Sequence, residues 1–294
     1  MDTTFDAAVI GAGPAGLQAA LTLGRMHRSA VVFDAGTYRN DPTDAAHNLI
    51  GHDGQAPAEL RAAARADVAR YDDVRFVDAE VSRVTGSAGA FALETASGAF
   101  SARRVILATG VRDTLPAIPG LADAFGTVVA HCPFCHGHEF AGRAVALIGP
   151  GPMLLHMSAL MDPIASSVVG YPSAPLTPDE EAALAARGVE ISEAPIREIR
   201  RAGDGVKVDG RPFGGALVRV ESAPAAPHAE QLGLELSDLG LIATDALGRT
   251  SEPGVFAAGD AAHQRGLPGP MWQLWSAIAT GAAAATATVQ SLLA

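Results

Sequence analysis

The 294-residue sequence predicts an α/β fold made of two doubly wound parallel sheets. Two apolar runs, at residues 5–10 and 144–148, each enter a glycine-rich turn that is followed by a segment with helical apolar spacing. A third apolar run ends near residue 260 in a Gly-Asp pair, so the last third of the chain returns to the pattern of the first. The length and the 48% hydrophobic content are sufficient for two cores.

The first of these units predicts a Rossmann-like nucleotide-binding domain. The strand at 5–10 enters the turn Gly11-Ala12-Gly13-Pro14-Ala15-Gly16, helical spacing follows over 17–26, and a second strand at 29–33 ends at Asp34. The glycines allow a tight turn, close approach of the backbone to a pyrophosphate, and close packing of helix on strand. Asp34 is placed to accept a hydrogen bond from a ribose hydroxyl.

The following segments extend this domain to a boundary near residue 113. Residues 58–71 have the spacing of an amphipathic helix, and residues 74–84 and 90–94 alternate as strands. A buried strand at 104–110 runs into Thr109 and Gly110, and three chain-breaking residues follow it at 116, 119 and 120. Proline and glycine interrupt helices and central strands, so we expect a domain crossing at 111–120.

The second glycine-rich turn, Gly149-Pro150-Gly151-Pro152-Met153-Leu154, is a degenerate version of the first. Leu154 stands where a small residue allows close helix packing, and each proline lacks a backbone donor. The next strand, at 167–170, ends in Tyr171-Pro172-Ser173, with neither a ribose-binding acid nor an arginine cluster. The sequence therefore argues against specific NADPH binding in this second domain. A helix at 178–187 and short strands near 189, 206 and 217 complete it.

The final third predicts a strand at 250–260 that ends in Gly259-Asp260, then a long helix over 271–293. The aspartate can accept a hydrogen bond from a cofactor hydroxyl, and the helix turns its positive end toward negative charge. Met271, Trp272 and Trp275 at helical spacing either flank a cofactor or pack in the core, and the spacing favours the core. We therefore expect one domain from residues 1–113 and 232–294, and an inserted domain from 114–231.

Both cysteines lie in the segment His131-Cys132-Pro133-Phe134-Cys135-His136-Gly137-His138. A Cys-x-x-Cys pair lowers the pKa of one thiol and favours redox exchange over structural cross-linking. Histidine titrates near neutrality and can generate a substrate thiolate, so His136 is the first candidate base, followed by His138 and His131. The alternatives are hydrogen-bonded turn residues, c-type haem attachment, which lacks signs of export, and a zinc site, whose ligands would be crowded.

Composition excludes several classes of partner. The net charge of −11 and a pI near 5.2 argue against nucleic acid or an anionic membrane. The first ten residues contain no cationic region followed by a long apolar one, so we expect a cytoplasmic protein. In the cytoplasm an isolated Cys-x-x-Cys is more often catalytic or metal-binding than structural.

Taken together, these motifs resemble the low-molecular-weight thioredoxin reductase family almost from end to end. The resemblance rests on GAGPAG with Asp34, LATG at 107–110, the cysteine pair ahead of Gly149, and PGVFAAGD at 253–260. It implies a homodimer and an FAD-binding domain that is split by the domain carrying the cysteines. Asn48 then falls in a loop over the flavin, where a polar surface turn is the alternative, and Gln273 falls near the flavin pyrimidine. The remaining implied FAD contacts are Gly11, Gly13, Pro14, Ala15, Gly16, Asp34, Thr109, Gly110, Gly259 and Asp260.

Two departures from the reductases change the expected reaction. His136 stands where the reductases carry an acid, and no arginine-rich segment follows the second turn. The segment HCPFCHGHE is more similar to flavin-dependent dithiol oxidases such as those that close the disulfides of gliotoxin and holomycin. That resemblance implies exchange of a small-molecule dithiol at Cys132, a Cys135 that lies against the flavin, and O2 as acceptor with H2O2 as product. The alternatives are an NADPH-dependent disulfide reductase and a non-catalytic flavoprotein redox sensor.

Overall fold

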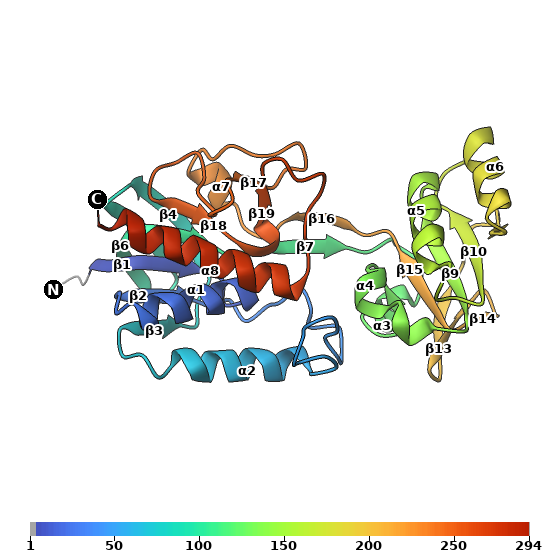
Figure 1. The fold of residues 1–294 in the computed structure, drawn as a ribbon, viewed down its shortest axis with the longest axis horizontal. Helices are drawn as coiled ribbons and strands as arrows, with labels where there is room; N and C mark the ends of the chain where they lie inside the picture. Colours follow the sequence, from blue (N-terminus) through green and yellow to red (C-terminus); the bar gives the residue numbers. More distant parts are fainter. Residues whose placement is uncertain (1–3, 294) are drawn as a thin grey trace. The chain divides into compact units, whose positions relative to one another are not determined.

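The computed structural model describes residues 4–293 and divides into two compact units (Figure 1). Unit 1 contains the chain up to Arg39, Ala58–Arg112, and the chain from Ser222 onward, whereas unit 2 contains Asn40–Pro57 and Asp113–Glu221. The chain leaves unit 1 along β7 (Val111–Thr114) and returns along β16 (Glu221–Pro224), and these two strands pair with each other.

The two units differ from the expected domains in two segments. Residues 40–57 belong to unit 2, and residues 222–231 belong to unit 1. The first difference arises because the loop hydrogen bonds to the cysteine segment through Thr43, whose hydroxyl lies 3.3 Å from His136 Nε2. Such a contact between residues far apart in the chain has no local pattern in the sequence. The second segment contains α7 (His228–Gln231), whose Gln231 accepts a hydrogen bond from the backbone N–H of Val84.

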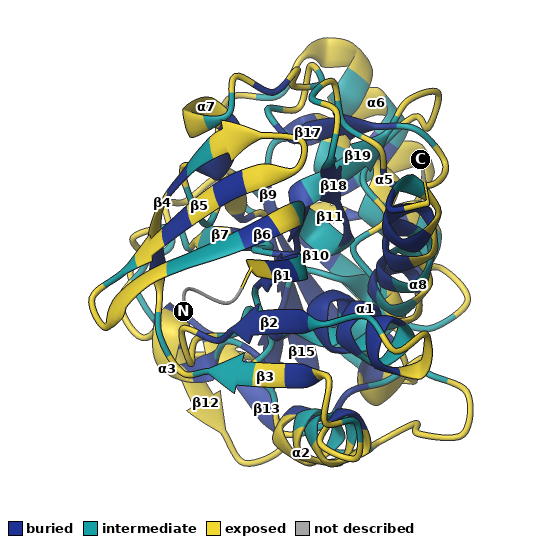
Figure 2. Cartoon of the chain, turned by 90° about the vertical axis from the view of Figure 1, so that its left-hand side faces the viewer, coloured by how far each residue is buried: buried dark blue, intermediate teal, exposed yellow. Residues whose placement is uncertain are grey.

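Unit 1 is built on a seven-stranded sheet in the order β3-β2-β1-β6-β5-β4, with β18 paired to β6. The strands are β1 (Thr4–Ile10), β2 (Ala30–Phe33), β3 (Val74–Val77), β4 (Val81–Ser87), β5 (Ala90–Thr95), β6 (Gly98–Leu107) and β18 (Val255–Ala257). All pairs are parallel except those of the β4-β5-β6 meander. Every residue of β2 and five of the seven residues of β1 are buried, as in parallel strands covered on both faces (Figure 2).

Helices α1 (Pro14–Arg25) and α8 (Leu274–Ser291) lie side by side, although they come from opposite ends of the chain (Figures 1 and 2). Gly281 makes this proximity possible, because a Cβ atom there would overlap the carbonyl group of Ala15. The many alanines of α8 act in the same way, since small side chains let two helix backbones approach closely. Unit 1 also contains α2 (Pro57–Val68) and the parallel pair β17 (Ile242–Thr244) and β19 (Ala262–Gln264).

Unit 2 contains a second parallel sheet in the order β11-β10-β9-β15-β8. Its strands are β8 (Val129–Ala130), β9 (Ala144–Gly149), β10 (Ser167–Pro172), β11 (Glu190–Ile191) and β15 (Gly215–Val218). The helices are α3 (Leu121–Ala124), α4 (Pro133–His136), α5 (Gly151–Met161) and α6 (Pro178–Ala186). A small antiparallel sheet contains β12 (Ile199–Ala202), β13 (Gly205–Val208) and β14 (Arg211–Phe213).

The predicted fold class is confirmed, but several element boundaries differ and short elements such as α3 and α7 were not predicted. Helix α1 begins at Pro14 rather than at residue 17, because proline is well suited to the first helical position. The last helix begins at Leu274 rather than 271, and Gln273 is its N-cap. The strand predicted at 250–260 is limited to β18, followed by a 3₁₀ turn at Gly259–Ala261. Among the described helices, none is both long and apolar enough to cross a membrane.

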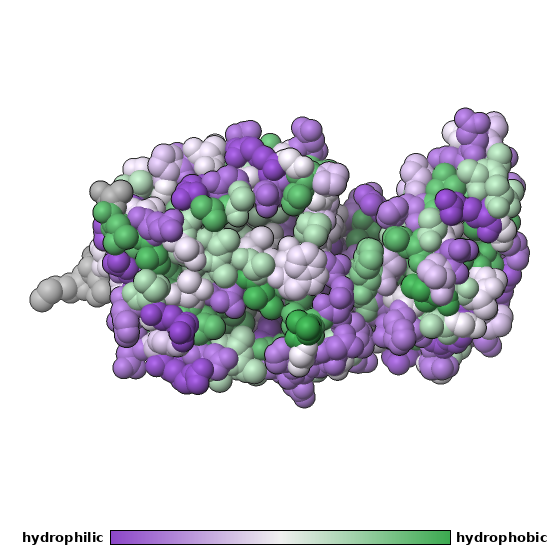
Figure 3. Space-filling model, in the orientation of Figure 1, coloured by the Kyte–Doolittle hydropathy of each residue, from purple (hydrophilic) through white to green (hydrophobic). Residues whose placement is uncertain are grey.

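The surface corrects one expectation about the core. Met271 and Trp275 are 46% and 43% exposed, so they are not core residues. The reason is that Met271 precedes α8 and Trp275 lies in its first turn, on a side that neighbouring elements do not cover. The face drawn in Figure 3 carries apolar side chains interspersed with polar ones.

Candidate functional site

The first glycine-rich turn has the shape required to hold a pyrophosphate. Gly11 has a φ of +105°, and a Cβ there would overlap the carbonyl group of Ala108. A Cβ on Gly16 would overlap the carbonyl oxygen of Gly11, so these two glycines are required for packing. Gly13 differs, because a Cβ there would have no neighbour within 4 Å. The turn is therefore open at its central glycine, next to the N-terminus of α1, where an anion is favoured.

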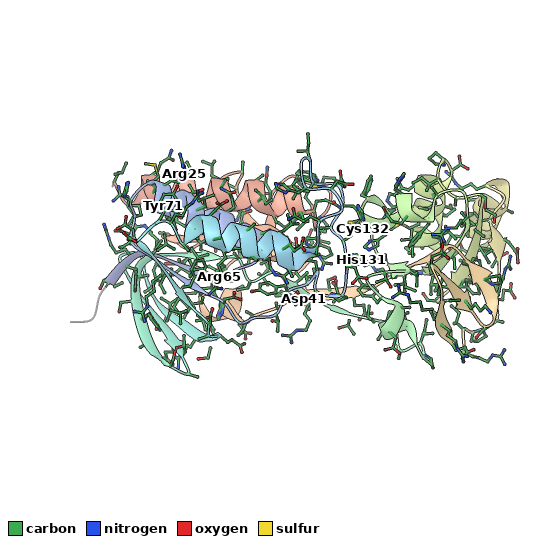
Figure 4. All side chains as sticks on the ribbon, turned by 90° about the horizontal axis from the view of Figure 1, so that it is seen from below. Arg25, Asp41, Arg65, Tyr71, His131 and Cys132 are labelled. Atoms are coloured by element: carbon green, nitrogen blue, oxygen red, sulfur yellow. A yellow bond between two sulfur atoms is a disulfide. The ribbon has the colours of Figure 1, made fainter. Side chains whose placement is uncertain are left out.

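Asp34 follows β2 at the end of the first βαβ unit and is buried. Its carboxylate accepts hydrogen bonds from the Gly36 N–H at 2.9 Å, the Tyr38 hydroxyl at 2.6 Å and Arg65 at 2.8 Å. Three donors leave about one of the four acceptor positions of a carboxylate for a ribose hydroxyl. Burial, together with Asp34, raises the pKa of Tyr38 to about 12. Asp34, Tyr38 and Arg65, which is labelled on α2 in Figure 4, line a cavity of about 210 Å³.

Asp260 is held in position by Arg39, which the sequence did not indicate, and by Trp272. Arg39 Nη1 lies 2.9 Å from Asp260 Oδ2, and both side chains are largely shielded from solvent. The Arg39 guanidinium also stacks over the Trp272 ring at 4.3 Å, and Trp272 Nε1 donates to the Asp260 carbonyl oxygen at 3.1 Å. The arrangement fixes the carboxylate at the end of β18. Trp272 thus positions a candidate cofactor residue instead of filling the core.

Three further predicted cofactor residues of unit 1 lie just after parallel strands. Thr109 and Gly110 follow β6, and Gly259 follows β18, which pairs with β6. Gly259 has a φ of +68°, and its N–H donates to Thr280 Oγ1 at 3.0 Å. A Cβ on Gly259 would lie 2.9 Å from the Cβ of Ala15, which ties this turn to the first one. Open space above Gly13 and carboxylates at two strand ends fit a dinucleotide such as FAD.

The cysteines of unit 2 form a disulfide at the start of α4. Cys132, labelled beside His131 in Figure 4, is the N-cap of α4, and its Cα lies 5.3 Å from that of Cys135. The Cys132 carbonyl accepts hydrogen bonds from the N–H groups of Cys135 and His136, both at 3.2 Å. A single helical turn thus brings the two sulfurs together. A bonded pair is the oxidised form that a dithiol can reduce by exchange.

The surroundings of His136 favour its neutral imidazole form. Its Nε2 lies 3.2 Å from the Gly126 carbonyl oxygen, which can only accept, so Nε2 carries the proton. Thr43 Oγ1, 3.3 Å from Nε2, donates its own proton to the Ala45 carbonyl and therefore accepts from the ring. Burial lowers the pKa of His136, while the hydrogen bond to Gly126 acts in the opposite direction. Nδ1 therefore has a lone pair, and it is buried without a hydrogen-bond partner among the described residues.

A cavity of about 320 Å³ in unit 2 brings Cys135, His138 and Asn48 together. Asn48 has a φ of +61°, and its N–H donates to Asp53 Oδ1 at 2.7 Å. His138 is exposed at this cavity, which Phe134, Asp53, His47 and Glu139 complete. The cysteine expected to face the flavin and the asparagine expected at the ring edge thus share one cavity.

The three histidines of the motif occupy three different environments. His131 stacks on Phe125 with the ring centroids 5.8 Å apart, whereas His138 is exposed. His136 is the one whose pKa burial lowers. It is therefore the histidine of the motif whose neutral form is favoured by burial.

The second turn accommodates its large residue in an unexpected way. Leu154 is fully buried and packs opposite Gly170 of β10. A Cβ on Gly170 would already lie 3.4 Å from Leu154 Cδ1. The bulky residue in the turn is thus compatible with a close βαβ unit.

Several residues that shape both sites were missed from the sequence. Arg39 and Thr43 act across long sequence separations and Gly126 lies 10 residues before His136, and no spacing rule relates them to Asp260 or His136. Tyr38 and Arg65 surround Asp34. Tyr38 could have been found from the sequence, because it follows Asp34 by only four residues and its hydroxyl can reach that carboxylate.

Comparison with known proteins is consistent with this geometry. The model of a family described as pyridine nucleotide-disulphide oxidoreductase matches residues 5–284. Thioredoxin reductase tcpT of Claviceps purpurea is 36% identical over 87% of this chain and 86% of its own. Thioredoxin reductase aclD of Aspergillus oryzae is 34% identical over 87% and 88%. An oxidoreductase structure from Agrobacterium tumefaciens has a TM-score of 0.88 at 35% identity, with 99% of both chains covered. The structure of HlmI has a TM-score of 0.87 at 34% identity and covers 100% of this chain and 95% of its own.

Proposed function

The chain belongs to the pyridine nucleotide-disulphide oxidoreductase family and is thioredoxin reductase-like, and from this premise we propose that it oxidises a small-molecule dithiol with O2. The products are a substrate disulfide and hydrogen peroxide. The observation that carries the proposal is the Cys132–Cys135 disulfide directly followed by His136, a half-buried histidine whose pKa is lowered by burial and whose Nδ1 has no hydrogen-bond partner among the described residues.

The disulfide supplies the exchange chemistry. A substrate thiolate attacks the Cys132 sulfur, the bond between Cys132 and Cys135 breaks, and Cys135 leaves as a thiolate. The second substrate thiolate attacks the substrate sulfur of the mixed disulfide, releases Cys132, and closes the substrate disulfide. Two electrons and two protons have then passed from the substrate to the enzyme. Bound FAD, held by unit 1, would supply the two-electron chemistry that returns the cysteines to the disulfide and reduces O2 to H2O2.

His136 serves as the base in this scheme. Thiols have an ordinary pKa near 8.5, so near neutrality only about a few per cent of a substrate thiol is ionised. The Nδ1 lone pair of His136 accepts the thiol proton, while Nε2–H keeps donating to the Gly126 carbonyl oxygen and Thr43 Oγ1. His138, exposed at the Cys135 cavity, is the second candidate for the same role.

The direct test supplies the FAD-loaded protein with dithiothreitol in air and records oxygen uptake and peroxide. We expect sustained turnover with one O2 consumed for each dithiol, and half the net oxygen uptake when catalase is added. Cys135→Ser should abolish turnover and retain FAD, because the proposed cofactor contacts lie largely in unit 1. An absence of turnover with every dithiol tried would contradict the proposal.

Two alternative functions predict different results when the flavin spectrum is followed in the same assay. An NADPH-dependent disulfide reductase, which the names of the relatives favour, would show rapid anaerobic bleaching of the flavin by NADPH. A non-catalytic redox sensor would exchange one pair of electrons and then stop. We further propose a cytoplasmic homodimer, and light scattering of the purified protein tests its oligomeric state.

A further inference from the structure

The two glycine-rich turns of this chain differ at their central glycine. At Gly13, in the first turn, a Cβ would meet nothing within 4 Å. At Gly151, the corresponding position of the second turn, a Cβ would lie within 2.7 Å of all three carboxyl atoms of Glu180. The space through which a pyrophosphate approaches the backbone is therefore open in one turn and filled by a carboxylate in the other.

The Glu180 carboxylate is fixed in this position by its own helix. Thr177 is the N-cap of α6, and its N–H donates to Glu180 Oε2 at 2.8 Å. In return the Glu180 N–H donates to Thr177 Oγ1 at 3.3 Å, which completes a capping box. The carboxylate is thus part of a reciprocal hydrogen-bond pair, and its Oε1 atom faces the first residue of α5.

The rest of the turn also lacks what a phosphate needs. Pro150 has no N–H where the first turn has Ala12, and the N–H of Leu154 donates to the Pro150 carbonyl at 3.0 Å. A Cβ on Gly149 would lie 2.6 Å from the sulfur of Met153, so a side chain covers that glycine as well. The positive end of α5 is accordingly complemented by Glu180, a charge of the same sign as a phosphate.

We infer that Glu180 is a specificity residue that closes the second turn to the pyrophosphate of NADH and NADPH. The inference rests on the proposed function, since it gives a physical reason why this chain directs electrons to O2 instead of taking them from a pyridine nucleotide. Like charges about 4 Å apart repel strongly near a protein surface, and a pyrophosphate carries about two of them.

The experiment compares three variants in the FAD-loaded protein. Glu180→Gln removes the charge and keeps the capping box, and Glu180→Ala removes both charge and bulk. Glu181→Ala is the matched control, because it removes one exposed carboxylate from the same helix turn without contact to Gly151. NADPH and NADH binding is measured by calorimetry at low salt, and anaerobic flavin reduction by each nucleotide is followed in parallel.

We expect no saturable binding for the wild type and for Glu181→Ala. Glu180→Ala should bind saturably, with a Kd at least about tenfold below the lower limit set by the wild-type titration, and Glu180→Gln should be intermediate. Equal binding by the Glu180 variants and the control would overturn the inference, and so would tight binding by the wild type. Dithiol-driven oxygen uptake, measured on the same samples, judges the proposed function separately. Uptake without a gain in nucleotide binding would leave the oxidase intact and reject the role of Glu180.

Discussion

Replacement of Gly13 by alanine separates cofactor binding from folding. Gly13 has a φ of −71° and a ψ of −177°, values that any L-residue adopts, and its Cβ would enter open space. The apoprotein should therefore keep its stability or gain about 0.4–1 kcal/mol from reduced chain entropy in the unfolded state. The new methyl group occupies the space in which we expect a phosphate to approach the backbone.

The expected loss of affinity follows from one hydrogen bond to a charged group. Such a bond contributes about 1.5–3 kcal/mol, which corresponds to about 10- to 150-fold weaker FAD binding. Bound FAD at about 100 times its Kd stabilises the protein by about 2.7 kcal/mol, and a tenfold loss of affinity reduces this to about 1.4 kcal/mol. The melting temperature should thus fall in the FAD-loaded Gly13→Ala protein and remain unchanged or rise in the apoprotein.

The assay combines FAD fluorescence titration with thermal unfolding of both forms. Gly16→Ala is the contrasting variant, because its Cβ would overlap the carbonyl oxygen of Gly11 and should destabilise the apoprotein itself. Native FAD affinity in Gly13→Ala would show that no phosphate approaches this glycine. A destabilised Gly13→Ala apoprotein would show that the space is not open.

Three further predictions concern titrating groups. Because burial lowers the pKa of His136, the acid limb of the pH–rate profile should lie below pH 6.5. His136→Gln should slow turnover by about 10²-fold or more in steady-state kinetics. Unchanged rates in both His136→Gln and Thr43→Val would reject His136 as the base. Burial also lowers the pKa of His228, whose ring bonds Gln231 at 3.0 Å, so the folded state favours neutral imidazole. Stability should be full above pH 6.5 and fall as the pH decreases below it, and urea titrations of His228→Gln should show a smaller fall. The raised pKa of Tyr38, about 12, means that folding favours its neutral form, so stability from this group should be lost as the pH rises from 10 to 12; Tyr38→Phe should remove that loss in alkaline unfolding, and an identical loss would contradict the hydrogen bond to Asp34.

Local sequence patterns determined much of the architecture. Glycine spacing after an apolar run located the β1-α1 and β9-α5 turns, because close approach of backbones is possible only where side chains are absent. The Cys-x-x-Cys spacing likewise matches one helical turn, which is why the disulfide closes within α4. Element ends were less well determined, as for the last helix, since tertiary packing decides how far a helix extends.

The sequence by itself determined the two βαβ units with their turns and the pairing of the cysteines, because these depend on residues close together in the chain. Only the tertiary structure decided which charges meet at each site. Arg39 lies 221 residues from Asp260, and Thr43 lies 93 residues from His136. The same holds for the Glu180 carboxylate at Gly151. Such contacts arise when separate elements pack together, so no spacing in the sequence encodes them, and they set the charge, proton position and accessibility of each site.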